Sequence, residues 1–174
     1  LSPPDQPMSR ELLDAPGGFA WWYADMVDAH GNGLVLIWSF GLPFLPGYAD
    51  AARQGAPERA GARPSLNIAT YTRGQLDFYL LQELDPSDAT WSRSTNEWQF
   101  GSTLLTSRRE GDRHVLQVDF DAAVPGEDRP LTGSLTIEGP ARRSCAFETR
   151  LDGLPEHDWS PLTVAASGHA SLEL

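Results

Sequence analysis

Short runs of alternating apolar and polar residues, rather than a helical repeat, dominate the chain. Two such runs, 19–28 and 34–40, flank His30-Gly31-Asn32-Gly33. That composition is typical of a hairpin turn, because Asn and Gly adopt positive φ at little cost. Both faces of the first run are largely apolar, which predicts a strand that is covered on both sides.

The same pattern continues along the chain. A second hairpin is expected from 65–72 and 76–84 about Arg73-Gly74-Gln75, and a third from 102–108 and 114–120 about Glu110-Gly111-Asp112. Further strands are predicted over 131–138, 144–151 and 165–174, and a short helix over 48–54 within a Pro- and Gly-rich connection. Regular short strands with turns between them favour an all-β antiparallel sandwich or closed barrel with one or two short helices.

The domain organisation follows from composition. Residues 1–16 are rich in Pro and Asp and are expected to form an N-terminal arm, whereas 17–174 read as one β-domain. A chain of 174 residues can form one independent core. No run of about 18 apolar residues is present, which predicts no transmembrane segment.

Charge and reactive residues exclude several classes of function. The net charge is −11, so a nucleic-acid backbone would be repelled. All 13 basic residues are Arg, which leaves no Lys for Schiff-base chemistry, and Cys145 is the only cysteine. The four His residues fit no metal-binding spacing, and no G-x-S-x-G motif is present. We therefore expect no metal, no cofactor and no nucleic-acid partner.

The candidate chemistry centres on Trp21, Tyr23 and Asp25, which share one face of the first strand. A carboxyl group between aromatic walls has a raised pKa, because burial destabilises its charged form, and it can then donate a proton at neutral pH. The alternative is that Trp21 and Tyr23 belong to the core, while Asp25 accepts hydrogen bonds from the backbone or an Arg.

Two further groups carry aromatic residues. Tyr71, Tyr79 and Glu83 lie on the middle hairpin, where Glu83 is either a paired carboxylate or a solvated residue at a strand end. The stretch 91–98 is expected to be a loop whose tryptophans, including Trp98, line a pocket mouth or cap the core.

Several segments together resemble a known family. Gly17-Gly18-Phe19-Ala20-Trp21-Trp22-Tyr23-Ala24-Asp25 resembles the G-G-x-x-W-W-Y-x-D opening of the carotenoid 1,2-hydratase family, also called hydroxyneurosporene synthases. Weaker matches follow in the same order at 43–53, 66–71, 100–102 with 115–121, and 156–161. One segment differs from the family pattern. Where the family has T-E-R, this chain has Gln82-Glu83-Leu84, so Glu83 matches the motif and the basic residue that follows it in the family is missing.

The resemblance implies a lipocalin-like β fold and a hydrophobic substrate, an acyclic carotenoid or other isoprenoid. Family members add water to a C=C bond without a redox cofactor, which implies a protonated carboxyl group and rings that stabilise a carbocation. On this basis the catalytic candidates are Asp25 and Glu83. The substrate-binding candidates are Trp21, Trp22, Tyr23, Tyr71, Tyr79 and Trp98.

The resemblance also implies one of two alternatives: the chain is the N-terminal half of a two-domain protein, with a C-terminal partner domain, or it is a reduced relative of the family. The implied location is the bacterial cytoplasm, with peripheral membrane contact left open. Two alternatives to an enzyme remain: a non-catalytic binder whose cavity is lined by Trp21, Tyr71 and Trp98, and a structural domain that packs on a partner through an apolar patch.

Overall fold

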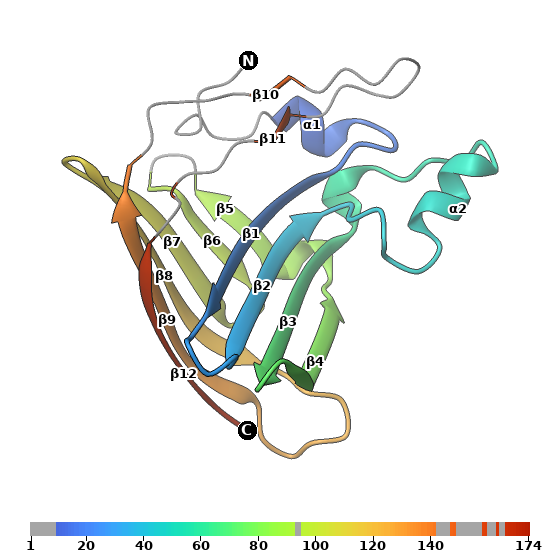
Figure 1. The fold of residues 1–174 in the computed structure, drawn as a ribbon. Coiled ribbons are helices and arrows are strands. Elements are labelled where there is room, and N and C mark those ends of the chain that lie inside the picture. Colours follow the sequence, from blue (N-terminus) through green and yellow to red (C-terminus); the bar gives the residue numbers. More distant parts are fainter. Residues whose placement is uncertain (1–9, 93–94, 142–146, 149–157, 160–162, 164–165) are drawn as a thin grey trace.

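The chain folds as a β-sandwich of two antiparallel sheets (Figure 1). The computed structural model describes residues 10–92, 95–141, 147–148, 158–159, 163 and 166–174. In the described residues no strand pairing joins the two sheets, so the predicted all-β fold is confirmed as a sandwich and not as a closed barrel.

The first sheet has four strands in the order β1-β2-β3-β4. Its strands are β1 (Ala20–Val27), β2 (Gly33–Phe40), β3 (Pro64–Thr72) and β4 (Gln75–Glu83). Each strand pairs with the next one in sequence, which confirms the first two predicted hairpins.

The second sheet has six strands in the order β12-β9-β8-β7-β6-β5. Its strands are β5 (Ala89–Ser92), β6 (Glu97–Phe100), β7 (Thr103–Glu110), β8 (Arg113–Ala122), β9 (Leu131–Pro140) and β12 (Ser167–Glu173). The third predicted hairpin and the strands expected at 131–138 and 165–174 are therefore confirmed. A separate pair, β10 (Phe147–Glu148) with β11 (Asp158–Trp159), covers part of the strand expected at 144–151, whose other residues lie outside the described ones.

Helices are few and short, as predicted. They are α1 (Arg10–Asp14), α2 (Tyr48–Arg53) and the 3₁₀ turns η1 (Ala60–Ala62) and η2 (Pro86–Asp88). The helix α2 confirms the one expected over 48–54. Among the described residues, none of these helices is long and apolar enough to cross a bilayer.

The turn of the first hairpin lies at the polar residues where it was predicted. The Asp28 carboxylate accepts hydrogen bonds from the backbone N–H groups of His30 and Asn32 at 2.7 and 2.8 Å, and Gly31 has φ of 79°. These hydrogen bonds stabilise the ionised carboxylate and lower the pKa of Asp28. The turn fixes the register in which Trp22 lies opposite Trp38.

The core lies between the two sheets. Leu36, Leu66 and Ile68 of the first sheet are fully buried, as is Leu105 of the second. Residues directly opposite each other in antiparallel strands point to the same side, so the even positions of β1 and β2 all face this core.

Two predictions about local structure are wrong. The strand β1 is not covered on both sides, because Trp21, Tyr23 and Val27 on its second face are 40%, 50% and 74% exposed. The stretch 91–98 is not a loop, since β5 and β6 form a hairpin in which Trp91 lies opposite Trp98. Its Ser- and Asn-rich middle suggested a loop, but that composition belongs only to the short connection between the strands.

Replacing Leu36 by Ala tests where the core lies. Leu36 is fully buried, so the variant should lose about 2–5 kcal/mol of unfolding free energy. Leu76→Ala is the matched control, because Leu76 is also a strand residue but is 57% exposed, and it should change stability by only about 0.5 kcal/mol. Urea denaturation measures both, and equal losses would contradict this assignment of the core.

Candidate functional site

Six of the eight predicted site residues gather on one surface, the side of the first sheet that faces away from the second. We call this surface the outer face. Its cross-strand rows follow from the strand registers. The rows are Trp21-Ser39-Ser65-Glu83, Tyr23-Ile37-Asn67-Leu81, Asp25-Val35-Ala69-Tyr79 and Val27-Gly33-Tyr71. The predicted residues among them are Trp21, Tyr23, Asp25, Tyr71, Tyr79 and Glu83.

The remaining two candidates, Trp22 and Trp98, lie on the opposite side of the strands in the core. The ring of Trp22 is 5.2 Å from that of Trp98 and stacks on Trp38 at 6.1 Å between ring centroids. Trp98 is only 5% exposed. The structure therefore separates the predicted aromatic residues into two groups, one on the outer face and one inside the sandwich.

Asp25 lies beside Tyr23 on the outer face, and a hydrogen bond joins the two side chains. Partial burial raises the pKa of the Tyr23 phenol above its usual value of 10.0, and the negative charge of Asp25, the hydrogen bond to it and nearby Tyr71 raise it further. The aromatic neighbour of the acid is therefore as predicted. The predicted pocket that shields the acid from water is wrong. Asp25 is exposed, because the even positions of β1, and not the odd ones, face the core.

The long connection between β2 and β3 covers one end of the outer face. Its residues Leu42, Leu45 and Tyr48 form a small apolar cluster with Ile37 and Leu81 of the sheet. This packing explains why Ser39 and Ser65, which lie on the outer face, are nonetheless buried.

The same connection adds an aromatic side chain to the outer face. Phe44 is 73% exposed, and its ring meets that of Trp21 edge-on at 6.2 Å and 67°. No periodic pattern could predict this contact, because Phe44 lies in an irregular segment. Phe44 extends the row of rings formed by Trp21 and Tyr23.

Arg63 holds this connection against the sheet. Its Nη1 donates to Glu58 Oε1 at 3.1 Å, and its Nη2 donates to Glu83 Oε2 at 3.1 Å and to the carbonyl oxygen of Pro46 at 3.0 Å. Its guanidinium also lies 5.9 Å from the centre of the Tyr48 ring. The hydrogen bond to Glu83 contributes most to raising the pKa of Arg63. Glu83 is thus a paired carboxylate, and the basic partner missing from the adjacent sequence comes from Arg63.

A second polar pair lies in the middle of the outer face. The Asn67 side-chain amide donates to the Tyr79 hydroxyl oxygen at 2.9 Å. Asn67 is 9% exposed whereas Tyr79 is 56% exposed, so a nearly buried amide orients a surface phenol.

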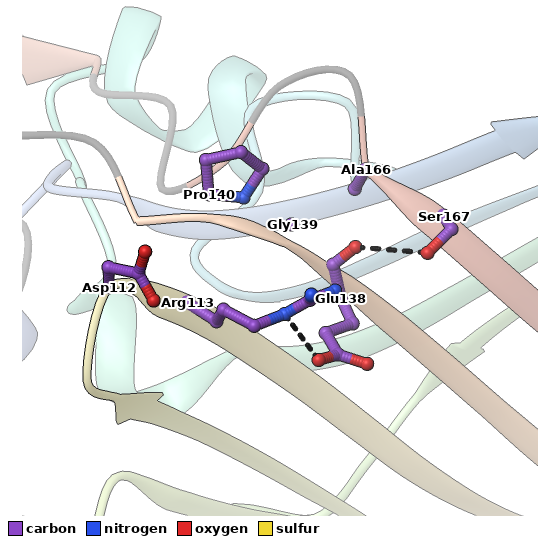
Figure 2. A pocket seen from close by; sticks show the side chains of 7 residues that line it. All are labelled: Asp112, Arg113, Glu138, Gly139, Pro140, Ala166 and Ser167. Carbon is purple, nitrogen blue, oxygen red and sulfur yellow. Dashed lines mark hydrogen bonds and ion pairs between the residues drawn. The ribbon is translucent and has the colours of Figure 1, made fainter.

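A polar pocket of about 340 Å³ lies on the other sheet, at the ends of β8 and β9 next to the start of β12 (Figure 2). Arg113 and Glu138 form an ion pair there, and Ser167 Oγ donates to the Glu138 carbonyl oxygen at 3.4 Å. None of the eight predicted site residues lines this pocket. In the part of the chain that the structure describes, no three His, Cys, Asp or Glu side chains gather in a metal-binding group.

Comparison with known proteins supports the resemblance seen in the sequence motifs. Over 91% of its length the chain is 32% identical to a protein named acyclic carotenoid 1,2-hydratase from Rubrivivax gelatinosus. Over 94% it is 25% identical to a protein of the same name from Thiocapsa roseopersicina, and over 93% it is 26% identical to a hydroxyneurosporene dehydrogenase from Chlorobaculum tepidum.

The chain spans 40%, 38% and 44% of the length of these three relatives. No protein-family model and no solved structure matches it. The curated relatives confirm the predicted resemblance to the carotenoid 1,2-hydratase family.

The Tyr23–Asp25 contact can be tested by titration. Replacing Asp25 by Asn removes the negative charge, so the pKa of Tyr23 should fall towards 10.0. Phenolate absorbance, with the Tyr23→Phe spectrum subtracted, measures this pKa. Asp119→Asn on β8 is the control and should leave it unchanged, because Asp119 lies on the other sheet.

The same contact predicts a pH dependence of stability. A phenol whose pKa is raised by folding contributes stability that is fully present below the unfolded pKa, near 10.0, and is lost as pH rises through the folded value. The alkaline loss of stability should therefore be smaller in Tyr23→Phe than in the wild type. Identical alkaline profiles would contradict the shift.

Arg63→Met tests how the connection is held. The change leaves Glu58 and Glu83 without their shared partner, and we expect a loss of about 1–3 kcal/mol of unfolding free energy. Arg53→Met is the control: its ion pair with Asp50 joins side chains that are 71% and 60% exposed, so the loss should stay below about 1 kcal/mol. Urea denaturation measures both, and a loss no larger for Arg63→Met would contradict the role of Arg63.

Proposed function

We propose that this chain takes part in the hydration of an acyclic carotenoid or a related isoprenoid, with the outer face as the surface that binds the polyene. The observation that carries the proposal is the position of Asp25 beside Tyr23 on a face lined with exposed rings. Similarity to two proteins named acyclic carotenoid 1,2-hydratase supports it.

The outer face has the composition that a polyene requires. Trp21, Tyr23 and Tyr79 are 40%, 50% and 56% exposed, and Phe44 is 73% exposed. Apolar surface of this kind gains free energy when it is removed from water, in proportion to the area covered. A long hydrocarbon lying across the strands would cover several rings at once.

The proposed reaction needs no redox partner. The Asp25 carboxylic acid transfers its proton to one carbon of the terminal C=C bond, and the π electrons form the new C–H bond. The other carbon becomes a tertiary carbocation, which faces of the neighbouring rings stabilise. Water then forms a C–O bond to that carbon and returns one proton to the carboxylate, so that the net change is addition of H₂O.

Protonation of Asp25 depends on covering the face. The Asp25 side chain is exposed. A polyene lying over Tyr23 and Asp25 would remove water from the carboxyl group and favour its neutral form. A further domain in a protein of the relatives' length would have the same effect, and we include such a partner in the proposal.

Glu83 takes a different role in this proposal. Its carboxylate is paired with Arg63. Glu83 therefore acts as a positioning residue, which keeps the β2–β3 connection and its Phe44 next to the binding face, rather than as a proton donor.

A second candidate function is binding without catalysis. The observation that favours it is the exposure of Asp25, since no described residue buries the acid. Both functions use the same outer face, so ligand binding alone does not distinguish them. Product formation does.

The test incubates the whole protein with a lycopene-type carotenoid, and hydroxylated product is measured by chromatography. Asp25→Asn should lower the rate by about 10²-fold or more, because the proton donor is lost. The control Asp119→Asn replaces an exposed Asp on the other sheet and should keep the full rate. Tryptophan fluorescence quenching should show that both variants still bind the carotenoid.

Two results would contradict parts of the proposal. Equal product from the wild type and Asp25→Asn would remove Asp25 from the mechanism. Quenching by the carotenoid with no product from the wild type would establish the non-catalytic alternative.

A further inference from the structure

Three indole N–H groups inside the sandwich lack an acceptor among the described residues. They are the Nε1 atoms of Trp38, Trp91 and Trp98, and each is shielded from solvent. An indole N–H can only donate, and nearly all buried donors in proteins have a partner, either a protein atom or an ordered water. Three such donors in one part of a core therefore call for an acceptor.

The three residues lie close together across the space between the sheets. Trp91 on β5 is directly opposite Trp98 on β6, so both side chains point to the same side of the second sheet. Trp38 on β2 of the first sheet meets Trp98 with ring centroids 5.8 Å apart. Trp38 and Trp98 are 3% and 5% exposed.

Ring faces are available to Trp38 and Trp98, but among the described residues no aromatic pair includes Trp91. The Trp38 and Trp98 rings meet at 68°, and in such an edge-to-face pair one ring supplies the edge and the other the face. At most one of the two N–H groups is satisfied within this pair, although the Trp22 ring, 5.2 Å from that of Trp98 and tilted at 59°, offers Trp98 a second ring face. Trp22 and Trp38 are nearly parallel at 10°, a stacking that directs no N–H at a ring face.

We propose that the interior beside Trp38, Trp91 and Trp98 is a binding site for a neutral oxygen acceptor, either an ordered water or the hydroxyl group of a small alcohol. Surrounding side chains such as Leu36, Phe100 and Leu105 are apolar and fully or almost fully buried, so they offer no acceptor themselves. An oxygen with two lone pairs accepts two of these donors, and a neutral guest avoids the large cost of burying a charge. This inference does not depend on the hydratase proposal, which concerns the outer face.

The experiment is a ¹H–¹⁵N correlation spectrum of the whole chain labelled at tryptophan, without ligand and then with geraniol. An indole proton donated to oxygen is shifted downfield, whereas one that lies over a ring face is shifted upfield. Trp→Phe replacements at 38, 91 and 98 assign the signals, and Trp21→Phe assigns an exposed control. Where a replacement prevents folding, nuclear Overhauser contacts in the wild type give the assignment.

Each outcome decides the proposal. Downfield signals from at least two of the three buried groups without ligand, with slow hydrogen exchange, identify a bound water. Downfield shifts that appear only with geraniol, and not with the matched hydrocarbon myrcene, identify a hydroxyl-binding site. Signals from the three groups that stay upfield or unshifted with and without geraniol would overturn the proposal, because the indoles would then have no oxygen partner.

Discussion

The packing of Trp22 against Trp38 and Trp98 determines which side of the first sheet faces outward. Because side chains alternate along a strand, a change of one residue in register would exchange the two faces of β1. Placing Trp22 in the core therefore places Trp21, Tyr23 and Asp25 on the outer face. Trp22 stacks on Trp38 within the first sheet at 6.1 Å, and its tilted contact with Trp98 at 5.2 Å spans the two sheets, so that together they fix this choice.

A second constraint shapes the outer face itself. A sheet with one bare apolar side would expose more hydrophobic surface than most monomeric domains do. The β2–β3 connection covers part of it with Leu42, Leu45 and Tyr48, and Arg63 fastens that connection by contacts to two carboxylates and a carbonyl. What remains open is the end that carries Tyr23, Asp25 and Tyr79. The boundary of the candidate site is thus set by this apolar packing together with the contacts of Arg63.

The hairpins were predictable from sequence because their signals are local. Asp28, Gly31 and Asn32 determine a turn among themselves, and period-two alternation then identifies the strands on either side. The outward direction of Asp25 was not predictable, because both faces of 19–28 are apolar and only the opposing sheet decides which is buried. The ion pair between Arg63 and Glu83 joins residues 20 positions apart and depends on the β3–β4 register.

The aromatic residues show the same limit of prediction from sequence. Sequence identified tryptophans and tyrosines as the chemistry-bearing residues, but it grouped Trp22 and Trp98 with Tyr71 and Tyr79. The alternation along one strand reliably places neighbouring residues on opposite faces. Which residues of two different strands share a face can be known only from the register between those strands. Trp91 and Trp98 were assigned to a loop because four of the residues between them are Ser, Thr or Asn, a composition that describes the turn and not the strands beside it.

Solvation decides between the two functions that the outer face can serve. Aromatic surface binds a polyene whether or not a carboxyl group is present, so Trp21, Phe44 and Tyr79 alone account for a binder. Catalysis requires in addition that Asp25 hold a proton, and its side chain is exposed. Catalysis on this face therefore requires that water be excluded from Asp25 when the substrate binds, because neither the rings nor the acid suffices without that exclusion.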